Sequence, residues 1–165
     1  MGNIFSIKEV IDIAIEIEKN GKNFYHQMLN KVKDEKAQEI FEYLEEEEEK
    51  HIKTFEKILM LLKSETDIEI DTSTLSDEYY DYLKALSDEH IFTKQKAIEF
   101  EKMAVSDLQA IELAIGMEKD SILFYDEIKK IVKEKERDLV DKIIEQEKTH
   151  LYKLTSLKNI LLKIR

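Results

Sequence analysis

Residues 41–55, FEYLEEEEEKHIKTF, carry the pattern that decides the fold. Steps of three and four residues follow one side of a helix, and here they select Phe41, Leu44, Glu48, His51 and Phe55. That side is apolar except for one carboxylate and one imidazole a turn apart. The stretch therefore predicts an amphipathic helix whose inner side carries a Glu-x-x-His pair.

The same pattern occurs a second time, ninety-nine residues further along the chain. The matching positions are Val140, Ile143, Glu147, His150 and Leu154. The helices that precede the two patterns also match, with an offset of one hundred residues. Glu18 then aligns with Glu118, and Tyr25 aligns with Tyr125. We therefore expect two copies of one helical hairpin.

The rest of the chain is suited to long helices. Its 165 residues contain no proline and three glycines, and 38% of them are charged, a composition that gives strands little support. The predicted long helices cover 7–32, 35–63, 106–132 and 136–164. The connection over 64–105 is expected to contain short helices, one at 77–87 and another within 92–105. Residues 1–165 would thus form a single all-α domain.

The four glutamates are expected to meet near the middle of the bundle. Glu18 lies fourteen residues before Val32, at the turn of the first hairpin. Glu48 lies fourteen residues after Asp34, on the other side of that turn. In an antiparallel hairpin both carboxylates therefore lie about 21 Å from the turn. The second hairpin repeats this arrangement, and packing the two face to face gives a four-helix bundle with one long crossover.

Four carboxylates and two imidazoles in an apolar core need compensation. Burial of one unpaired carboxylate costs several kcal/mol even after relaxation, and like charges repel one another. The carboxylates could take up protons, or two divalent cations could cancel their charge, with the imidazoles as further ligands. Carboxylate and imidazole ligands suit iron or manganese better than copper, and they lack the thiolates of closed structural zinc sites. The pattern therefore favours a site for two metal ions.

Four short segments resemble the rubrerythrin branch of the ferritin-like superfamily. They are Glu18–Tyr25 (EKNGKNFY), Glu48–His51 (EEKH), Glu118–Tyr125 (EKDSILFY) and Glu147–His150 (EKTH). Two Glu-x-x-His pairs that alternate with two Glu-x6-Tyr elements make the resemblance specific, and it covers all four long helices. It implies a ferritin-like four-helix bundle, in which glutamates and Glu-x-x-His pairs hold two metal ions.

The resemblance also assigns the ligands. Six residues would hold the ions, namely Glu18, Glu48, His51, Glu118, Glu147 and His150. Among them, Glu48 and Glu147 would bridge the two ions. The ions would be iron, although manganese or mixed metals fit the same ligands. Tyr25 and Tyr125 would lie near the site, where each phenol either supports a ligand on a neighbouring helix or is a core aromatic.

The activity implied by the resemblance is that of an oxidoreductase. A di-iron protein of the rubrerythrin type would reduce hydrogen peroxide or dioxygen. Rubrerythrins typically add a rubredoxin-type iron site with Cys-x-x-Cys pairs, but this chain has no cysteine. Electrons would therefore come from an external donor protein. Two alternatives stay open: a ferroxidase or iron-handling protein, and a helical interaction protein without metal.

A second departure from the family lies one turn after Glu118. Rubrerythrins typically carry an extra glutamate at this position, where the chain has Ser121. This difference puts the peroxide-specific movement of iron associated with that glutamate in doubt. Ser121 and its counterpart Gly21 leave space beside the metal layer, which would serve as a substrate pocket or allow close helix packing.

The run of five glutamates that begins at Glu45 leaves one register open. Most of the run is expected to form a solvated side of the helix, with only one register pointing inward. Glu47 could replace Glu48 as the partner of His51, four residues away. The matching position in the second copy is Gln146, which favours Glu48.

Charge and hydropathy narrow the expected partners. The net charge of −11 argues against nucleic acid, whose phosphates would repel the chain. The sequence has no run of the roughly 18 apolar residues that a membrane span needs, and no basic start before an apolar run to indicate a signal peptide. We therefore expect a cytoplasmic protein without nucleic-acid or membrane partners. The resemblance further implies a homodimer.

Overall fold

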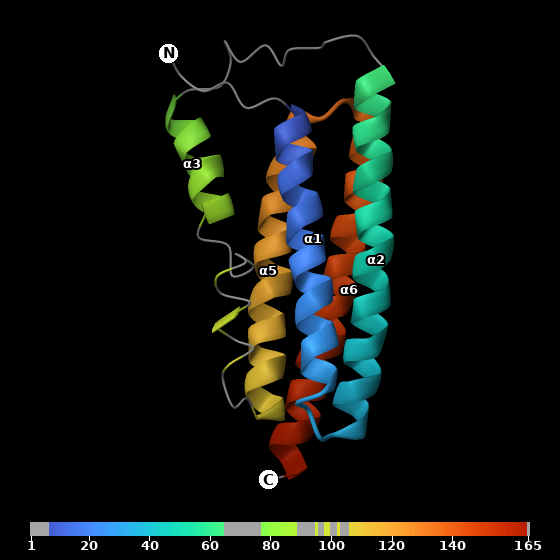
Figure 1. Cartoon of the computed structure of the whole chain (residues 1–165), viewed down its shortest axis with the longest axis vertical. Helices are drawn as coiled ribbons and strands as arrows, with labels where there is room; N and C mark the ends of the chain where they lie inside the picture. Colours follow the sequence, from blue (N-terminus) through green and yellow to red (C-terminus); the bar gives the residue numbers. More distant parts are fainter. Residues whose placement is uncertain are drawn as a thin grey trace.

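Four long helices form a bundle in the computed structural model of the chain (Figure 1). The structure describes residues 7–64, 77–88 and 106–164, together with 95, 98, 99 and 102. The long helices are α1 (Ile7–Leu29), α2 (Glu35–Ser64), α5 (Asp107–Ile131) and α6 (Glu134–Ile164). A shorter helix, α3 (Asp77–Asp88), follows α2 in the sequence. The second short helix, predicted within 92–105, falls largely outside the described residues.

The helices pair as the repeat predicts. Helix α1 packs against α2 and α5 packs against α6, while α1 meets α5 and α2 meets α6. The start of α5 lies beside the turn between α1 and α2, and α2 ends at the opposite end of the bundle (Figure 1). The connection from α2 to α5 therefore spans the length of the bundle. This is the predicted four-helix bundle with one long crossover, and α3 packs against α5.

The core is built from equivalent residues of the two hairpins. The buried pairs are Ile11 and Ile111, Ala14 and Ala114, Phe24 and Phe124, Met28 and Ile128, and Val32 and Val132. In α3, Leu83 is buried and Leu86 packs against the core, so this helix presents the apolar side that its sequence predicts. No described helix is long and apolar enough to cross a membrane.

Two helix ends differ from the prediction by more than one residue. Helix α1 ends at Leu29 instead of residue 32, because Lys31 and Val32 both donate to the carbonyl of Met28 and tighten the last turn. Helix α6 begins at Glu134 instead of residue 136, since the carbonyl of Lys133 already accepts from the N–H groups of Glu136 and Arg137, at 3.1 Å and 2.9 Å. Val32 and Val132 continue the apolar pattern, because their side chains are buried although α1 and α5 have already ended. Periodicity alone therefore overestimates α1.

The turn between α1 and α2 is fixed to the start of α5 by one carboxylate. The backbone N–H groups of Lys33 and Asp34 donate to Asp107, at 3.0 Å and 2.8 Å. Asp34 in turn caps α2, because its Oδ1 accepts from the N–H of Ala37 at 3.0 Å. Asp107 therefore joins the two hairpins at one end of the bundle.

We expect Asp107→Ala to lower the free energy of unfolding by about 1 to 2 kcal/mol, because two backbone donors lose their acceptor. Urea denaturation followed by circular dichroism measures the change. Asp126→Ala removes an exposed carboxylate from the same helix and serves as the control. Equal stabilities of the two variants would show that the Asp107 contacts contribute nothing.

Candidate metal centre

The structure brings all six predicted ligand residues together near the middle of the four long helices. Helices α1 and α5 each supply one glutamate, and α2 and α6 each supply a glutamate and a histidine. The six side chains are at most 5% exposed, and they are Glu18, Glu48, His51, Glu118, Glu147 and His150. The spacing of each Glu-x-x-His pair places both of its members on the inner side of the helix.

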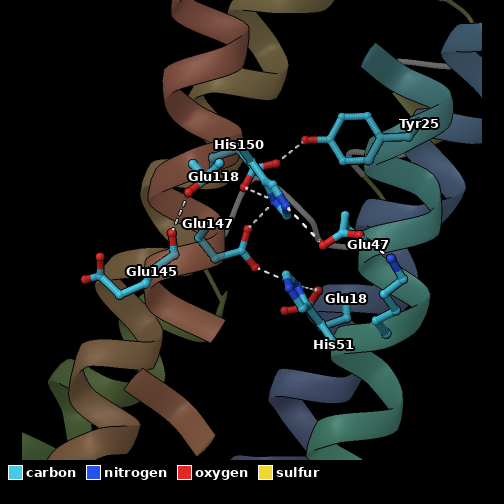
Figure 2. A network of polar contacts seen from close by, with 10 residues as sticks. Glu18, Tyr25, Glu47, His51, Glu118, Glu145, Glu147 and His150 are labelled. Carbon is cyan, nitrogen blue, oxygen red and sulfur yellow. Dashed lines mark hydrogen bonds and ion pairs between the residues drawn. The ribbon is translucent and has the colours of Figure 1, made fainter. Parts of the chain in front are cut away.

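Glu147 lies between the two imidazoles (Figure 2). Its Oε1 is 3.0 Å from Nδ1 of His51, and its Oε2 is 3.0 Å from Nδ1 of His150. The two rings stack with centroids 5.4 Å apart and planes inclined by 23°. Each histidine also faces a glutamate of another helix: His51 Nδ1 is 3.3 Å from Glu18 Oε2, and His150 Nδ1 is 3.5 Å from Glu118 Oε2. A carboxylate with one oxygen toward each ring is suited to bridge two cations.

The six residues form two groups that could each hold an ion. One group contains Glu18, Glu48, His51 and Glu147, and the other contains Glu48, Glu118, Glu147 and His150. Within each group, one ligand atom per residue lies within 4.8 Å of all the others. Ligand atoms at about 2.1 Å from one ion lie up to about 4.2 Å apart, so small side-chain shifts suffice. Glu48 and Glu147 belong to both groups.

Several buried polar atoms of the centre have no hydrogen-bond partner among the residues that the structure describes. They are Oε2 of Glu18, both ring nitrogens of His51, Oε1 of Glu147 and Nε2 of His150. Nδ1 of His51 and Oε1 of Glu147 lie close together, yet the pair is not aligned as a hydrogen bond. Buried polar atoms rarely lack partners. Oε2 of Glu18 and Oε1 of Glu147 both lie within 3.3 Å of Nδ1 of His51. A cation bound among these three atoms would satisfy them.

Burial opposes the negative charge of the carboxylates. It raises the pKa of Glu48 well above its usual range, and the nearby charge of Glu18 raises it further. Burial and the neighbouring Glu147 likewise raise the pKa of Glu118. Burial also disfavours the charge of Glu147, but hydrogen bonds from Glu118 and His150 outweigh it and lower the pKa of Glu147. Without cations, the centre therefore keeps protons on some of its carboxyl groups.

The imidazoles keep protons because the nearby carboxylates stabilise their positive charge, although burial opposes it. Burial alone lowers the pKa of His51, but the charges of Glu18 and Glu147 outweigh it and raise this pKa to about 11. Burial also lowers the pKa of His150, which contacts with Glu118 and Glu147 raise to about 9. Metal ligands must lose such protons, so a cation that binds here would displace them.

Two phenols connect α1 and α5 across the centre. The Tyr25 hydroxyl donates to Oε1 of Glu118 at 2.5 Å, and the Tyr125 hydroxyl donates to Oε1 of Glu18. Both rings are buried. Burial, together with the glutamate that each phenol contacts, raises the pKa of both tyrosines well above its usual range. Each tyrosine therefore stays protonated and orients a glutamate of the other hairpin.

The run of glutamates that begins at Glu45 turns two carboxylates inward instead of one. Glu47 is 6% exposed and Glu48 is 5% exposed, so the expectation that only one register points inward is wrong. Successive residues on a helix are about 100° apart, so Glu48 faces the centre while Glu47 faces α6. Oε2 of Glu47 lies 4.0 Å from Nε2 of His150. The second copy could not have indicated this, because Gln146 at the matching position is exposed.

Gly21 makes room for a carboxylate of the centre. A Cβ atom at this position would lie 3.1 Å from Oε2 and 3.3 Å from Cδ of Glu48. The matching residue in the second hairpin, Ser121, is also small and buried. The space beside Gly21 is thus occupied by the Glu48 side chain.

Gly21→Ala is expected to weaken metal binding by about tenfold, because the new methyl group displaces a carboxylate shared by both ligand groups. The metal-free variant should be at least as stable as wild type, since alanine is favoured over glycine in a helix by about 1 kcal/mol. Metal affinity and urea denaturation measure the two effects separately. Unchanged affinity would mean that Glu48 has freedom to move aside.

The crossover topology and the central glutamates and histidines define a ferritin-like bundle whose buried cluster fits a di-metal site. The rubrerythrin family model matches residues 9–158, and the chain belongs to that family. The chain is also similar to a crystal structure described as a candidate ferritin-like diiron-carboxylate protein from Thermotoga maritima. The identity is 23%, the TM-score is 0.65, and the match covers 96% of this chain and 98% of that chain. A sequence comparison with curated proteins finds no match.

Proposed function

We propose that this protein is a di-iron oxidoreductase of the rubrerythrin type, which reduces hydrogen peroxide or dioxygen with electrons from an external donor protein. The observation that carries this proposal is the pair of buried ligand groups that share Glu48 and Glu147. Two bound Fe(II) ions would supply two electrons together to one oxidant molecule. The protein supplies the position, charge and shielding of those ions.

The six central residues would act as the ligands. Glu48 and Glu147 belong to both groups and would be shared between the ions. The remaining ligands would be Glu18 and His51 for one ion, and Glu118 and His150 for the other. Two divalent cations would balance the four carboxylates, which removes the repulsion that raises the pKa of Glu48 and Glu118. Manganese fits the same donor atoms, and metal analysis distinguishes the two elements.

The tyrosines would orient the ligands Glu118 and Glu18 and keep water out of the centre. Tyr25 and Tyr125 fill the space beside the centre, and each donates to one glutamate. Because burial raises their pKa values, both phenols remain donors throughout the physiological pH range. Reduction of hydrogen peroxide to two water molecules consumes two protons and two electrons. The electrons require a partner, since the chain has no cysteine for a rubredoxin-type site.

A ferroxidase or iron-handling protein is the second candidate. The absence of cysteine favours it, because oxidation and transfer of iron need no reductase partner. In this case iron would be the substrate, and Fe(III) would accumulate or leave after each oxidation. The two candidates share the same ligands and differ in the fate of the iron.

Turnover with a reductant separates the two candidates. Protein loaded anaerobically with Fe(II) is mixed with hydrogen peroxide or dioxygen, with and without excess reductant. An oxidoreductase consumes many oxidant molecules per chain when reductant is present, and its iron stays bound. A ferroxidase gives oxidant consumption that follows the iron supplied. Bound iron that neither oxidant oxidises would contradict both.

A further inference from the structure

We propose that Glu47 positions the imidazole of His150 and thereby makes the two metal positions unequal. The proposal rests on the metal centre proposed above and adds a residue outside its six ligands. Glu47 would accept a hydrogen bond from the Nε2–H of His150. The ion held by His150 would then bind more tightly than the ion held by His51.

Glu47 approaches the centre from the side where α2 packs against α6 (Figure 2). Its buried carboxylate places Oε2 4.0 Å from Nε2 of His150. The other oxygen, Oε1, lies 2.5 Å from Nζ of Lys50, whose side chain is largely exposed. The carboxylate is thus held at one oxygen. A shift of about 1 Å brings the other oxygen within hydrogen-bond distance of the ring.

The orientation of His150 decides which of its nitrogens needs an acceptor. Nδ1 faces Glu118 and Glu147, at 3.5 Å and 3.0 Å, so it is the nitrogen that would face an ion. A neutral imidazole with its Nδ1 lone pair on a metal carries its proton on Nε2. A carboxylate at Nε2 fixes this tautomer and makes the ring a stronger ligand. Nε2 of His150 is buried and has no hydrogen-bond partner within the described part of the chain.

His51 lacks equal support. Its Nε2 is also buried, and none of the described residues gives it a hydrogen bond. Glu47 lies near a ring nitrogen of His51 as well, but its ion-pair contact is with His150. The residue that matches Glu47 in the second hairpin is Gln146, which is exposed. The repeat therefore supplies two equivalent histidines but one such carboxylate.

Packing reinforces the difference between the two rings. Tyr43 lies edge-on to His150, with centroids 5.9 Å apart. Lys153 covers the face of Tyr43, with Nζ 4.9 Å from the ring centroid. These contacts restrict the rotation of His150 before any ion binds, so less conformational entropy is lost on binding.

Titration of the metal-free protein with Co(II), in competition with a chelator, tests the proposal. We expect two Co(II) ions per chain with unequal affinities in wild type. Glu47→Met removes the acceptor and should weaken the tighter step by about 10- to 100-fold. Glu47→Gln keeps a neutral acceptor, so its affinity in the tighter step should lie between those of wild type and Glu47→Met. Glu46→Gln removes an exposed neighbouring charge and should leave both steps unchanged.

Proton NMR of the Co(II) protein gives a readout that general destabilisation would not produce. Each coordinated imidazole carries one exchangeable N–H proton, which the paramagnetic ion shifts away from other resonances. The Nε2 proton of His150, when it is hydrogen-bonded to Glu47, should exchange slowly with water. We expect one of the two signals to exchange faster in Glu47→Met, and the other to stay unchanged.

Three outcomes decide between the proposals. The role of Glu47 would be supported if the two Co(II) ions bind with unequal affinities, and if Glu47→Met weakens the tighter step while Glu46→Gln leaves both steps unchanged. Two ions bound with equal affinity, or Glu47 variants identical to Glu46→Gln, would overturn that role and leave the di-metal centre intact. A folded wild-type protein that takes up no Co(II), Mn(II) or Fe(II) would overturn the metal centre and the role of Glu47 with it.

Discussion

Glu147→Ala should reduce the iron content of anaerobically loaded protein from about two ions per chain to less than about one. Glu147 contributes to both ligand groups and places one oxygen near each imidazole. Its loss removes a ligand from both ions at once, whereas the loss of Glu18 or Glu118 affects one group. Elemental mass spectrometry after removal of unbound iron measures the content.

Glu145→Ala is the matched control for this experiment. Glu145 lies two residues away on α6, carries the same charge and is exposed, with Lys148 as its ion-pair partner. This variant should bind as much iron as wild type. If wild type, Glu145→Ala and Glu147→Ala all contain equal iron, the ion is held elsewhere and the assignment of Glu147 is wrong.

Metal-free protein should lose on the order of 5 kcal/mol of stability as the pH rises from 6.5 to 9, about half of it from each imidazole. The folded pKa of His150 is raised to about 9 and that of His51 to about 11. Groups with raised pKa values stabilise the fold fully below their unfolded pKa, and the contribution is lost as the pH rises through the folded value. Glu48 and Glu118, also raised, act in the same direction. Urea denaturation with a chelator present measures this slope.

The lowered pKa of Glu147 does not reverse this trend. A depressed carboxyl pKa stabilises the fold above the unfolded value of about 4.3, so its contribution is constant between pH 6.5 and 9. Metal binding should have the opposite dependence, because each ion displaces protons and binds more tightly as the pH rises. A pH indicator should therefore record proton release on metal addition. Stability independent of pH in the metal-free protein would show that the imidazoles are not charged there.

The sequence by itself determined the bundle and its central layer. Two Glu-x-x-His pairs ninety-nine residues apart, each in an apolar stripe, require helices whose polar residues share one height. A helix has a fixed rise and period, so the distance of Glu18 and Glu48 from their common turn fixes their level. The same reasoning applies to the second hairpin. Local periodicity is sufficient here because each hairpin is short in sequence and repeats.

Only the tertiary structure decided how neighbouring helices complete that layer. The sequence could not show that Tyr25 donates to Glu118 of the other hairpin, or that Asp107 binds the turn at Asp34. Nor could it show that Glu47 is buried against α6, because the repeat pointed to an exposed counterpart. Such contacts depend on the rotation of one helix against another, which a single helix period does not encode. The sequence therefore determines the level of each side chain, and the packing of the two hairpins determines its partner.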